Sequence, residues 1–331
     1  MTQTSKVNVL EDYRVAPPSE SSSGFDHLTG NHSRDTDEFY TLVPQMPPVI
    51  TNVSGALVAP LLALQVTLFP NVGGDAALLK DDQLLPLYDR TVIKDPKGLE
   101  EIFWRQLQDL KFEVSPFHFL PTNKVRATFI IRQVDVKQLK KSVSTSRPML
   151  PYVSTFTLAC AYVWSCMMKS RLGNGEEIDE DDLDFFICSV DCRPRVNPPL
   201  RTTYFGNCIA PVFVKAKTTQ LLGEEGFFMA AELIGEAIHN KQHNEEGGGG
   251  VLNGIENWFS EVEVLKLGRI VSVAGSPKMG FYSIDFGWGG PKKIEILSID
   301  VTEGDLEVGV SLRKIKMDAF ASIFADGIKN L

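Results

Sequence analysis

The chain has 331 residues, 43% of them apolar and 23% charged, so it can bury a large core and form two domains. Its formal net charge of -9 argues against a nucleic-acid groove or an anionic membrane surface, because both partners require clustered cations. No basic-then-apolar leader opens the sequence, so a cytoplasmic location is expected.

An apolar segment between residues 56 and 69 is interrupted by Pro60 and Gln65. It is too short to span a bilayer, which takes about 20 apolar residues. Its second half predicts a buried strand that ends at the turn Pro70-Asn71.

The middle of the chain alternates helical and strand patterns. Asp95-Pro96 predicts the N-cap and first residue of a helix, a strand is expected from Ala127 to Val134, and a basic helix from Val136 to Val143. The apolar side of the first helix is expected to carry Leu99, Ile102, Phe103, Leu107 and Leu110.

Ser154 predicts the cap of a helix whose apolar stripe belongs to the core. The stripe consists of Phe156, Ala159, Val163 and Met167. The acidic segment from Glu176 to Asp184 lacks the glycine and final glutamate of an EF-hand loop, so it is interpreted as a solvated turn before a strand from Phe185 to Val190.

Two more helices are expected in the carboxy-terminal third, with core residues at helical spacing. They carry Phe227, Ala231, Ile234 and Ile238 in the first helix, and Met317, Phe320, Ile323 and Phe324 in the second. The glycines of residues 247–250 lack the Gly-Lys-Ser/Thr of a phosphate loop and predict a flexible connection.

The cysteines are odd in number, crowded into one region and without a Cys-x-x-Cys pair. They are Cys160, Cys166, Cys188, Cys192 and Cys208. Zinc sites and secreted disulfide frameworks use paired cysteines, so this pattern predicts buried free thiols and no metal site.

Several short motifs, in a fixed order, resemble those of the BAHD family of plant acyl-CoA-dependent acyltransferases. They are Phe25 to His32, Leu68-Phe69-Pro70-Asn71, Tyr88-Asp89-Arg90, Asp191-Cys192-Arg193-Pro194-Arg195, Tyr204-Phe205-Gly206-Asn207-Cys208 and Asp285-Phe286-Gly287-Trp288-Gly289. The Tyr204 to Cys208 motif is similar to that of the branch that acylates anthocyanins and other flavonoid glucosides.

This resemblance implies an α/β protein with the two-domain acyltransferase fold, similar to chloramphenicol acetyltransferase. The expected domains are residues 1–143, incomplete, and residues 144–331, which carry Asp285 to Gly289. The implied activity is transfer of a malonyl or hydroxycinnamoyl group to a sugar hydroxyl of a phenolic glucoside, by a monomer that uses acyl-CoA as co-substrate and no cofactor. Donor, acceptor and regiochemistry stay open.

The family's general base is the histidine of a His-x-x-x-Asp motif, and this histidine is missing here. Asp75 resembles the motif's aspartate, but the position four residues earlier is Asn71, an amide without useful basicity. None of the chain's histidines has an aspartate four residues later, and His27 and His32 are interpreted as loop or strand-end residues.

The residues between Asn71 and Gly74 are interpreted as deleted, with further losses near Pro18 to Ser21 and between Lys80 and Leu84. Skipped exons, a faulty gene model and evolved loss of function are the competing accounts. The resemblance therefore implies acyl transfer as the family function, and the missing histidine predicts that this chain is impaired. The alternative is a catalytically inactive truncated product or a non-catalytic binding paralogue.

The glycines of the Asp285 to Gly289 motif permit a tight corner around Trp288. In the family this corner lies away from the bound acyl group and is thought to hold the shape of the substrate channel. A buried carboxylate needs a fixed cation, so Asp285 is expected to pair with Arg193 or Arg195.

Overall fold

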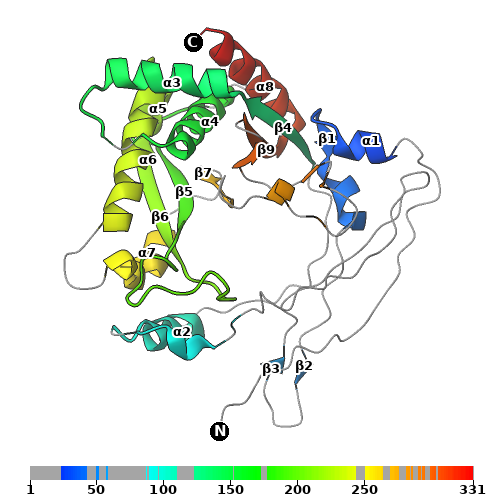
Figure 1. Ribbon diagram of the computed structural model, residues 1–331. Coiled ribbons are helices and arrows are strands. Elements are labelled where there is room, and N and C mark those ends of the chain that lie inside the picture. The colour runs from blue at the N-terminus through cyan, green and yellow to red at the C-terminus, as the bar shows by residue number, and fades with distance from the viewer. Residues whose placement is uncertain are drawn as a thin grey trace.

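The computed structural model describes residues 24–42, 50–51, 57–58, 87, 89–95, 97–109, 123–151, 153–172, 177–243, 250–263, 269–275, 281–283, 285, 290–291, 293–294, 299–302 and 305–330. Its helices are α1 (Gly24–Thr29), α2 (Leu99–Asp109), α3 (Gln133–Ser146), α4 (Thr155–Leu172), α5 (Thr218–Leu222), α6 (Gly226–His243), α7 (Trp258–Glu263) and α8 (Lys314–Lys329). Its strands are β1 (Arg34–Asp35), β2 (Ile50–Thr51), β3 (Leu57–Val58), β4 (Lys124–Ile131), β5 (Leu183–Asp191), β6 (Ile209–Lys217), β7 (Ile270–Ser272), β8 (Ile299–Thr302) and β9 (Asp305–Arg313). The predicted α/β class is confirmed (Figure 1).

One sheet joins strands from distant parts of the chain. Its order is β1-β4-β9-β8, and β4 pairs antiparallel with β9 from Lys124 opposite Arg313 to Ile131 opposite Leu306. The side chains of Leu306, Val308 and Val310 alternate with more exposed residues along β9. This period of two buries one face of the strand, and α8 contacts both β4 and β9.

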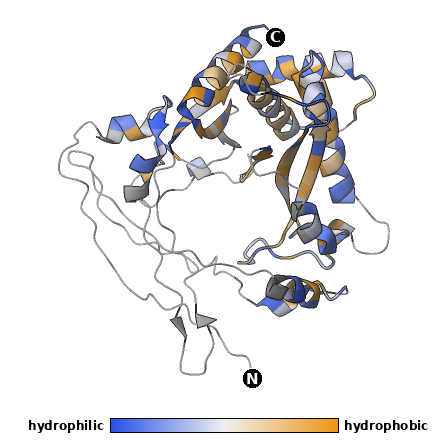
Figure 2. Ribbon diagram, turned by 180° about the vertical axis from the view of Figure 1, so that it is seen from behind, coloured by the Kyte–Doolittle hydropathy of each residue, from blue (hydrophilic) through white to orange (hydrophobic). Residues whose placement is uncertain are grey.

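A second sheet has the order β6-β5-β7. Strands β5 and β6 pair antiparallel from Leu183 opposite Lys217 to Asp191 opposite Ile209, and β7 is parallel to β5. Alternate residues of β6 are buried, from Ala210 to Ala216, and α6 contacts both long strands. Figure 2 shows hydrophobic residues along these strands.

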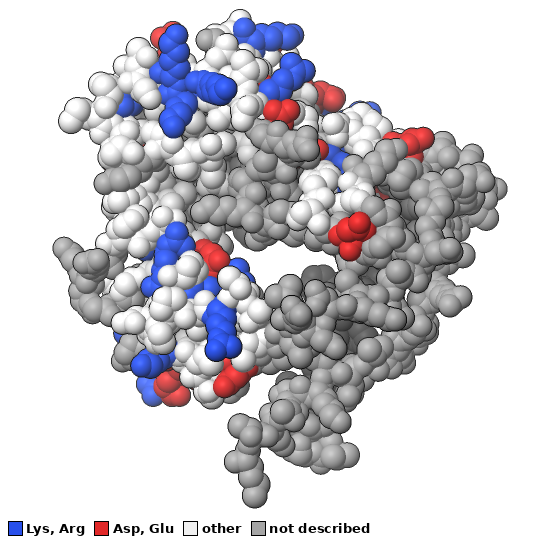
Figure 3. All heavy atoms as spheres, in the orientation of Figure 1, with Lys and Arg blue, Asp and Glu red and all other residues white. Residues whose placement is uncertain are grey.

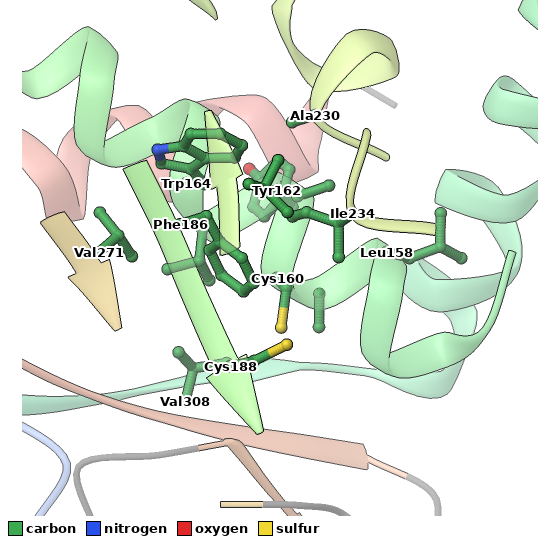
Figure 4. Packing of buried hydrophobic residues seen from close by; sticks show 14 of the residues in the cluster. Leu158, Cys160, Tyr162, Trp164, Phe186, Cys188, Ala230, Ile234, Val271 and Val308 are labelled. Carbon is green, nitrogen blue, oxygen red and sulfur yellow. The ribbon is translucent and has the colours of Figure 1, made fainter. Parts of the chain in front are cut away.

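Helix α4 is the centre of the core. The Oγ of Ser154 accepts a hydrogen bond from the backbone N–H of Thr157 at 3.0 Å, which confirms the predicted cap. Residues 157–166 are all buried, so the helix packs on every side and not along one stripe. The ring of Trp164 lies 5.6 Å from that of Phe186 on β5 (Figure 4).

The last helix, α8, closes this core against α4. The hydroxyl of Tyr162 donates to the carbonyl of Phe324 at 2.6 Å, and a Cβ at Gly327 would lie only 2.4 Å from that hydroxyl oxygen. Gly327 is therefore required for the close approach of the two helices. Met317, Phe320 and Phe324 are buried as predicted.

Several predicted element boundaries around α2, β4 and α3 are wrong. Helix α2 begins at Leu99, after Gly98, although Asp95 does accept hydrogen bonds from the N–H groups of Leu99 and Glu100. Strand β4 ends at Ile131 and α3 begins at Gln133, so the helix is longer than predicted and the strand stops earlier. The carboxylate of Asp135 accepts from the N–H of Arg132 at 2.8 Å, and this hydrogen bond stabilises the start of the helix at Gln133.

Helix α3 is basic on its exposed side, as predicted. Lys137, Lys140 and Lys141 are exposed, and Figure 3 shows basic side chains at the upper edge of the molecule, where α3 lies. Asp135 is the acidic residue of this helix and is buried.

The acidic segment before β5 contradicts the prediction of a solvated turn. Asp184 is 0% exposed and Asp182 is 8% exposed. Arg171 on α4 pairs with Asp184, and Arg269 donates to Asp182 at 2.5 Å. Two of the acidic residues are thus buried counterions of arginines that lie outside the acidic segment.

The expected strand ending at Phe69 and the glycines 247–249 lie outside the described residues; Gly250 begins a short 3-10 helix, Gly250–Leu252. The domain boundary between residues 143 and 144 stays a prediction. Strand β4, before that boundary, completes a sheet with β9, after it. Among the described residues, no helix combines the length and apolar character needed to cross a membrane.

Candidate functional site

Two of the motif segments meet in the structure although the sequence separates them widely. Leu87 forms a parallel bridge with Tyr204: its N–H donates to the carbonyl of Thr203 at 2.8 Å, and the N–H of Phe205 donates to the carbonyl of Leu87 at 2.9 Å. The start of the Asp89-Arg90 segment is therefore fixed to the loop that carries the subfamily motif.

Asp89 shapes the turn that follows this bridge. Its Oδ1 accepts from the hydroxyl of Thr91 at 2.6 Å and from the N–H of the same residue at 2.9 Å. These two hydrogen bonds lower the pKa of Asp89 from its ordinary value. Asp89 thereby caps the short 3-10 helix Arg90–Val92, so its role here is structural. Tyr88 lies outside the described residues.

The subfamily motif, Tyr204 to Cys208, divides into buried and exposed side chains. Tyr204 and Cys208 are buried, whereas Phe205 is 44% exposed and Asn207 is exposed. Gly206 lies against the phenol, because a Cβ at this position would meet the Tyr204 hydroxyl oxygen at 2.7 Å. The glycine lets the loop fold over the tyrosine and turn Phe205 and Asn207 outward.

Asp191, at the end of β5, holds both arginines of its own motif. The guanidinium of Arg193 donates to the two carboxylate oxygens of Asp191 at 2.9 and 3.0 Å, and Arg195 donates to the carbonyl of Asp191 at 2.8 Å. The hydrogen bond from Arg193 lowers the pKa of Asp191, although burial opposes it.

Asp285 is exposed, whereas the expected pairing with Arg193 or Arg195 assumed a buried carboxylate. Arg193 is paired with the carboxylate of Asp191, two residues before it, and the pairing of Asp285 with either arginine stays a prediction. Phe286, Gly287, Trp288 and Gly289 lie outside the described residues, as do Asn71 and Asp75.

Residues flanking the Asp285 motif are anchored to the β4–β9 sheet by Glu307, a residue that no sequence pattern singled out. Glu307 on β9 accepts from the Tyr282 hydroxyl at 2.6 Å and lies 3.5 Å from the ammonium of Lys293. Lys293 also donates to the side chain of Asn31 at 2.8 Å. These contacts link residues on both sides of the motif. They could not be predicted from the sequence, because the residues that they join lie far apart along it.

Histidines in the described part of the chain form two pairs. His27 lies in α1, not in a loop, and its Nε2 is 2.8 Å from Glu38 while its Nδ1 is 3.0 Å from the Nε2 of His32. His239 and His243 stack on α6 with ring centroids 4.2 Å apart. Both pairs make local contacts near the surface, and His118 lies outside the described residues.

All five cysteines are free and buried, as predicted. Burial raises the pKa of Cys166, Cys188 and Cys192 to about 12. Among the described residues, no group of three or more His, Cys, Asp or Glu side chains is placed to hold a metal ion.

A small cavity lies between α4, β5, β7 and β9. Its volume is about 40 Å³, and its walls include Cys160, Met167, Phe186, Val271 and Val308. A site for a drug-sized ligand typically occupies about 300 to 1,000 Å³, so this cavity is a packing defect of the core and not a substrate site.

Comparison with known proteins assigns a family. The model of the Transferase family matches residues 85–325. The chain is 42% identical to phenolic glucoside malonyltransferase 1 of Nicotiana tabacum, over 95% of this chain and 78% of the relative. It is 37% identical to a malonyl-coenzyme:anthocyanin 5-O-glucoside-6'''-O-malonyltransferase of Salvia splendens, over 93% of this chain and 74% of that relative.

A more distant relative uses another donor: coumaroyl-CoA:anthocyanidin 3-O-glucoside-6''-O-coumaroyltransferase 2 of Arabidopsis thaliana is 30% identical over 97% of this chain and 78% of its own length. Among solved structures, vinorine synthase matches 60% of this chain and 46% of its own, with 20% identity and a TM-score of 0.45.

Proposed function

The chain belongs to the Transferase family of BAHD-type acyltransferases, and from this membership we propose that its family reaction is transfer of a malonyl group from malonyl-CoA to a sugar hydroxyl of a phenolic or anthocyanin glucoside. The observation that carries the proposal is the 42% identity to a phenolic glucoside malonyltransferase over 95% of this chain. Malonyl is favoured over hydroxycinnamoyl because relatives that are 42%, 37% and 35% identical are named as malonyltransferases, whereas the coumaroyltransferase is 30% identical.

The reaction needs a base, an acyl donor and an oxyanion site. A base removes the proton of the sugar hydroxyl as its oxygen attacks the thioester carbonyl, and hydrogen-bond donors stabilise the tetrahedral oxyanion before coenzyme A leaves. Acyl-CoA is thus a co-substrate that is consumed in each cycle. We propose that the protein acts as a cytoplasmic monomer with no bound cofactor.

The motif residues receive separate roles in this proposal. Asp75 is the remnant of the catalytic pair, and Asp285 to Gly289 hold the shape of the substrate channel. The subfamily loop supports the proposal for the acceptor, since Phe205 and Asn207 point outward while Tyr204 anchors the loop to Leu87. An aromatic ring and an amide are suited to contact the phenolic ring and the hydroxyls of a glucoside.

We propose further that this chain is impaired as a catalyst. General acid-base catalysis typically contributes about 10² to 10⁴-fold to rate, so a chain with Asn71 at the base position should be slower by at least about this factor than an intact relative. A lost segment should cost more than a point change, because it also disturbs the positioning of the reactants.

The test is an assay with malonyl-CoA or coumaroyl-CoA and a phenolic or anthocyanin glucoside. The Asn71→His variant is expected to stay inactive, whereas reinsertion of the family segment between Asn71 and Gly74 should restore turnover, faster with malonyl-CoA. Robust turnover by the unaltered chain would show that another residue serves as base. A reinserted chain that binds malonyl-CoA without turnover would favour the alternative of a non-catalytic paralogue.

A further inference from the structure

Cys192 directly follows β5, and Cys208 directly precedes β6, the antiparallel neighbour of β5. The paired residues of the two strands end at Asp191 opposite Ile209, which places Cys192 and Cys208 opposite one another at the next position. The N–H of Cys192 donates to the carbonyl of Cys208 at 2.8 Å, so the ladder continues through this pair. Their thiols come from the two motif segments that frame the loop 193–207.

Both thiols lie on the same face of the sheet. Cys188 and Val190 in β5 are buried, as is Cys192 at the next alternate position, and Ala210 in β6 is buried, as is Cys208 at the alternate position before it. This alternation places the two thiols on one face. Opposite residues of an antiparallel pair have Cα atoms about 4.5 or 5.5 Å apart. Disulfides form at Cα separations of about 4.4 to 6.8 Å, so either spacing permits a bond.

We propose that Cys192 and Cys208 are an oxidative modification site, a dithiol that peroxide converts reversibly into a cross-strand disulfide. Cys208 is the entry residue, because it is 9% exposed whereas Cys192 is 0% exposed. Because so little of Cys208 is exposed, only a small oxidant such as hydrogen peroxide is expected to reach its thiol.

The chemistry balances in two steps. The Cys208 thiolate attacks one peroxide oxygen, which breaks the O–O bond and gives a sulfenic acid and hydroxide. The Cys192 thiolate then attacks the Cys208 sulfur, forms the S–S bond and expels the hydroxyl group. With the two thiol protons, the products are one disulfide and two waters; the dithiol loses two electrons and the peroxide gains them.

Burial and nearby cations have opposite effects on the pKa values of the two thiols. Burial raises the pKa of Cys208, and it raises that of Cys192 to about 12, which keeps both thiols protonated. Cations act in the other direction: Arg193 lowers the pKa of Cys208, while Lys241 and Arg195 lower that of Cys192. We therefore expect slow oxidation that requires an excess of peroxide.

The disulfide would covalently join the two ends of the loop 193–207, which contains Arg193, Arg195 and most of the Tyr204 to Cys208 motif. A cross-link between its two ends reduces the freedom of the unfolded chain, so the oxidised protein should unfold at a higher temperature. Reduction by dithiothreitol should reverse the change.

A second thiol pair provides an internal comparison. Cys160 on α4 lies close to Cys188 on β5, and Figure 4 shows their sulfur atoms directed toward one another. These side chains are only 1% and 2% exposed, and they join a helix to a sheet. They should stay reduced under conditions that oxidise Cys192 and Cys208.

The experiment treats the full chain with hydrogen peroxide, blocks remaining thiols and maps the peptides by mass spectrometry. The expected result is one linked peptide pair that contains Cys192 and Cys208, lost on reduction. In Cys208→Ser this linkage should vanish, and in the matched control Cys166→Ala it should persist. A higher melting temperature after oxidation should appear in the control and not in Cys208→Ser.

A second measurement avoids substitution altogether. Phenylarsine oxide, a trivalent arsenical that bridges two adjacent thiols, should protect Cys192 and Cys208 of the unaltered chain from peroxide and from alkylation. The proposal is overturned if Cys160 and Cys188 form the disulfide instead, or if Cys208 is oxidised to the sulfinic acid without forming a disulfide. It is also overturned if all five thiols remain unmodified while a small thiol compound, added to the same solution as a control, is oxidised.

Discussion

Asp184 is the residue at which one substitution should have the largest effect on folding. Its buried carboxylate accepts from the Thr218 hydroxyl at 2.5 Å, is paired with Arg171, and lies 3.6 Å from the guanidinium of Arg269. Asp184→Ala should lower the free energy of unfolding by about 3 to 5 kcal/mol, because it leaves a buried arginine without its counterion. Urea denaturation measures this loss.

Asp181 is the matched control, since it is 96% exposed in its ion pair with Lys217. Asp181→Ala should change the free energy of unfolding by no more than about 1 kcal/mol. Equal losses for the two variants would mean that the buried ion pairs add nothing beyond a surface pair.

Gly206 allows a second test at a single residue. A methyl group there meets the Tyr204 ring and hydroxyl, so Gly206→Ala should cost about 1 to 3 kcal/mol of stability. At Gly223 the nearest atom to an added Cβ is 3.5 Å away, an ordinary contact, so Gly223→Ala should be tolerated. Thermal unfolding of both variants checks this; a tolerant Gly206 would show that the loop moves freely away from Tyr204.

Helix α4 faces strands of the β6-β5-β7 sheet and of the β1-β4-β9-β8 sheet around the small core cavity. The start of this helix depends on one side chain. Removing the Ser154 hydroxyl in Ser154→Ala should cost about 0.5 to 2 kcal/mol of unfolding free energy, because the Thr157 N–H loses its acceptor. Thr145→Ala on exposed α3 removes a hydroxyl without a capping role and should stay within about 0.5 kcal/mol. Chemical denaturation that ranked them in the reverse order would contradict the capping role.

The predictability of these elements follows from where their stabilising contacts lie. Helices α4, α6 and α8 could be predicted because their apolar residues recur at helical spacing, and Ser154 acts within three residues of its partner. The start of α3 was misplaced because the Asp135 cap overrode the pattern of apolar residues. Asp182 and Asp184 were assigned to solvent because Arg269, which pairs with both, lies far along the sequence. The bridge between Leu87 and Tyr204 could not be predicted for the same reason, since its two residues are far apart in the sequence.

The whole molecule depends on a strand that lies before the expected domain boundary. A fragment of residues 144–331 lacks β4, so it leaves β9 without its long antiparallel partner and exposes an open strand edge. We expect this fragment to aggregate, whereas a fragment of residues 123–331, which retains β4 and α3, should be soluble. Sedimentation and urea denaturation of the two fragments compare them; equal behaviour would support a boundary at residue 143.

The pairing of β4 with β9 also sets the order of events during synthesis. On the ribosome, β4 emerges long before β9, so its sheet stays incomplete until β9 has been translated. Non-local strand pairing of this kind folds slowly, and its unpaired edge is open to other nascent chains in the meantime. A premature stop codon before β9 would therefore yield a chain that occupies chaperones and is degraded, even if every motif before it were intact.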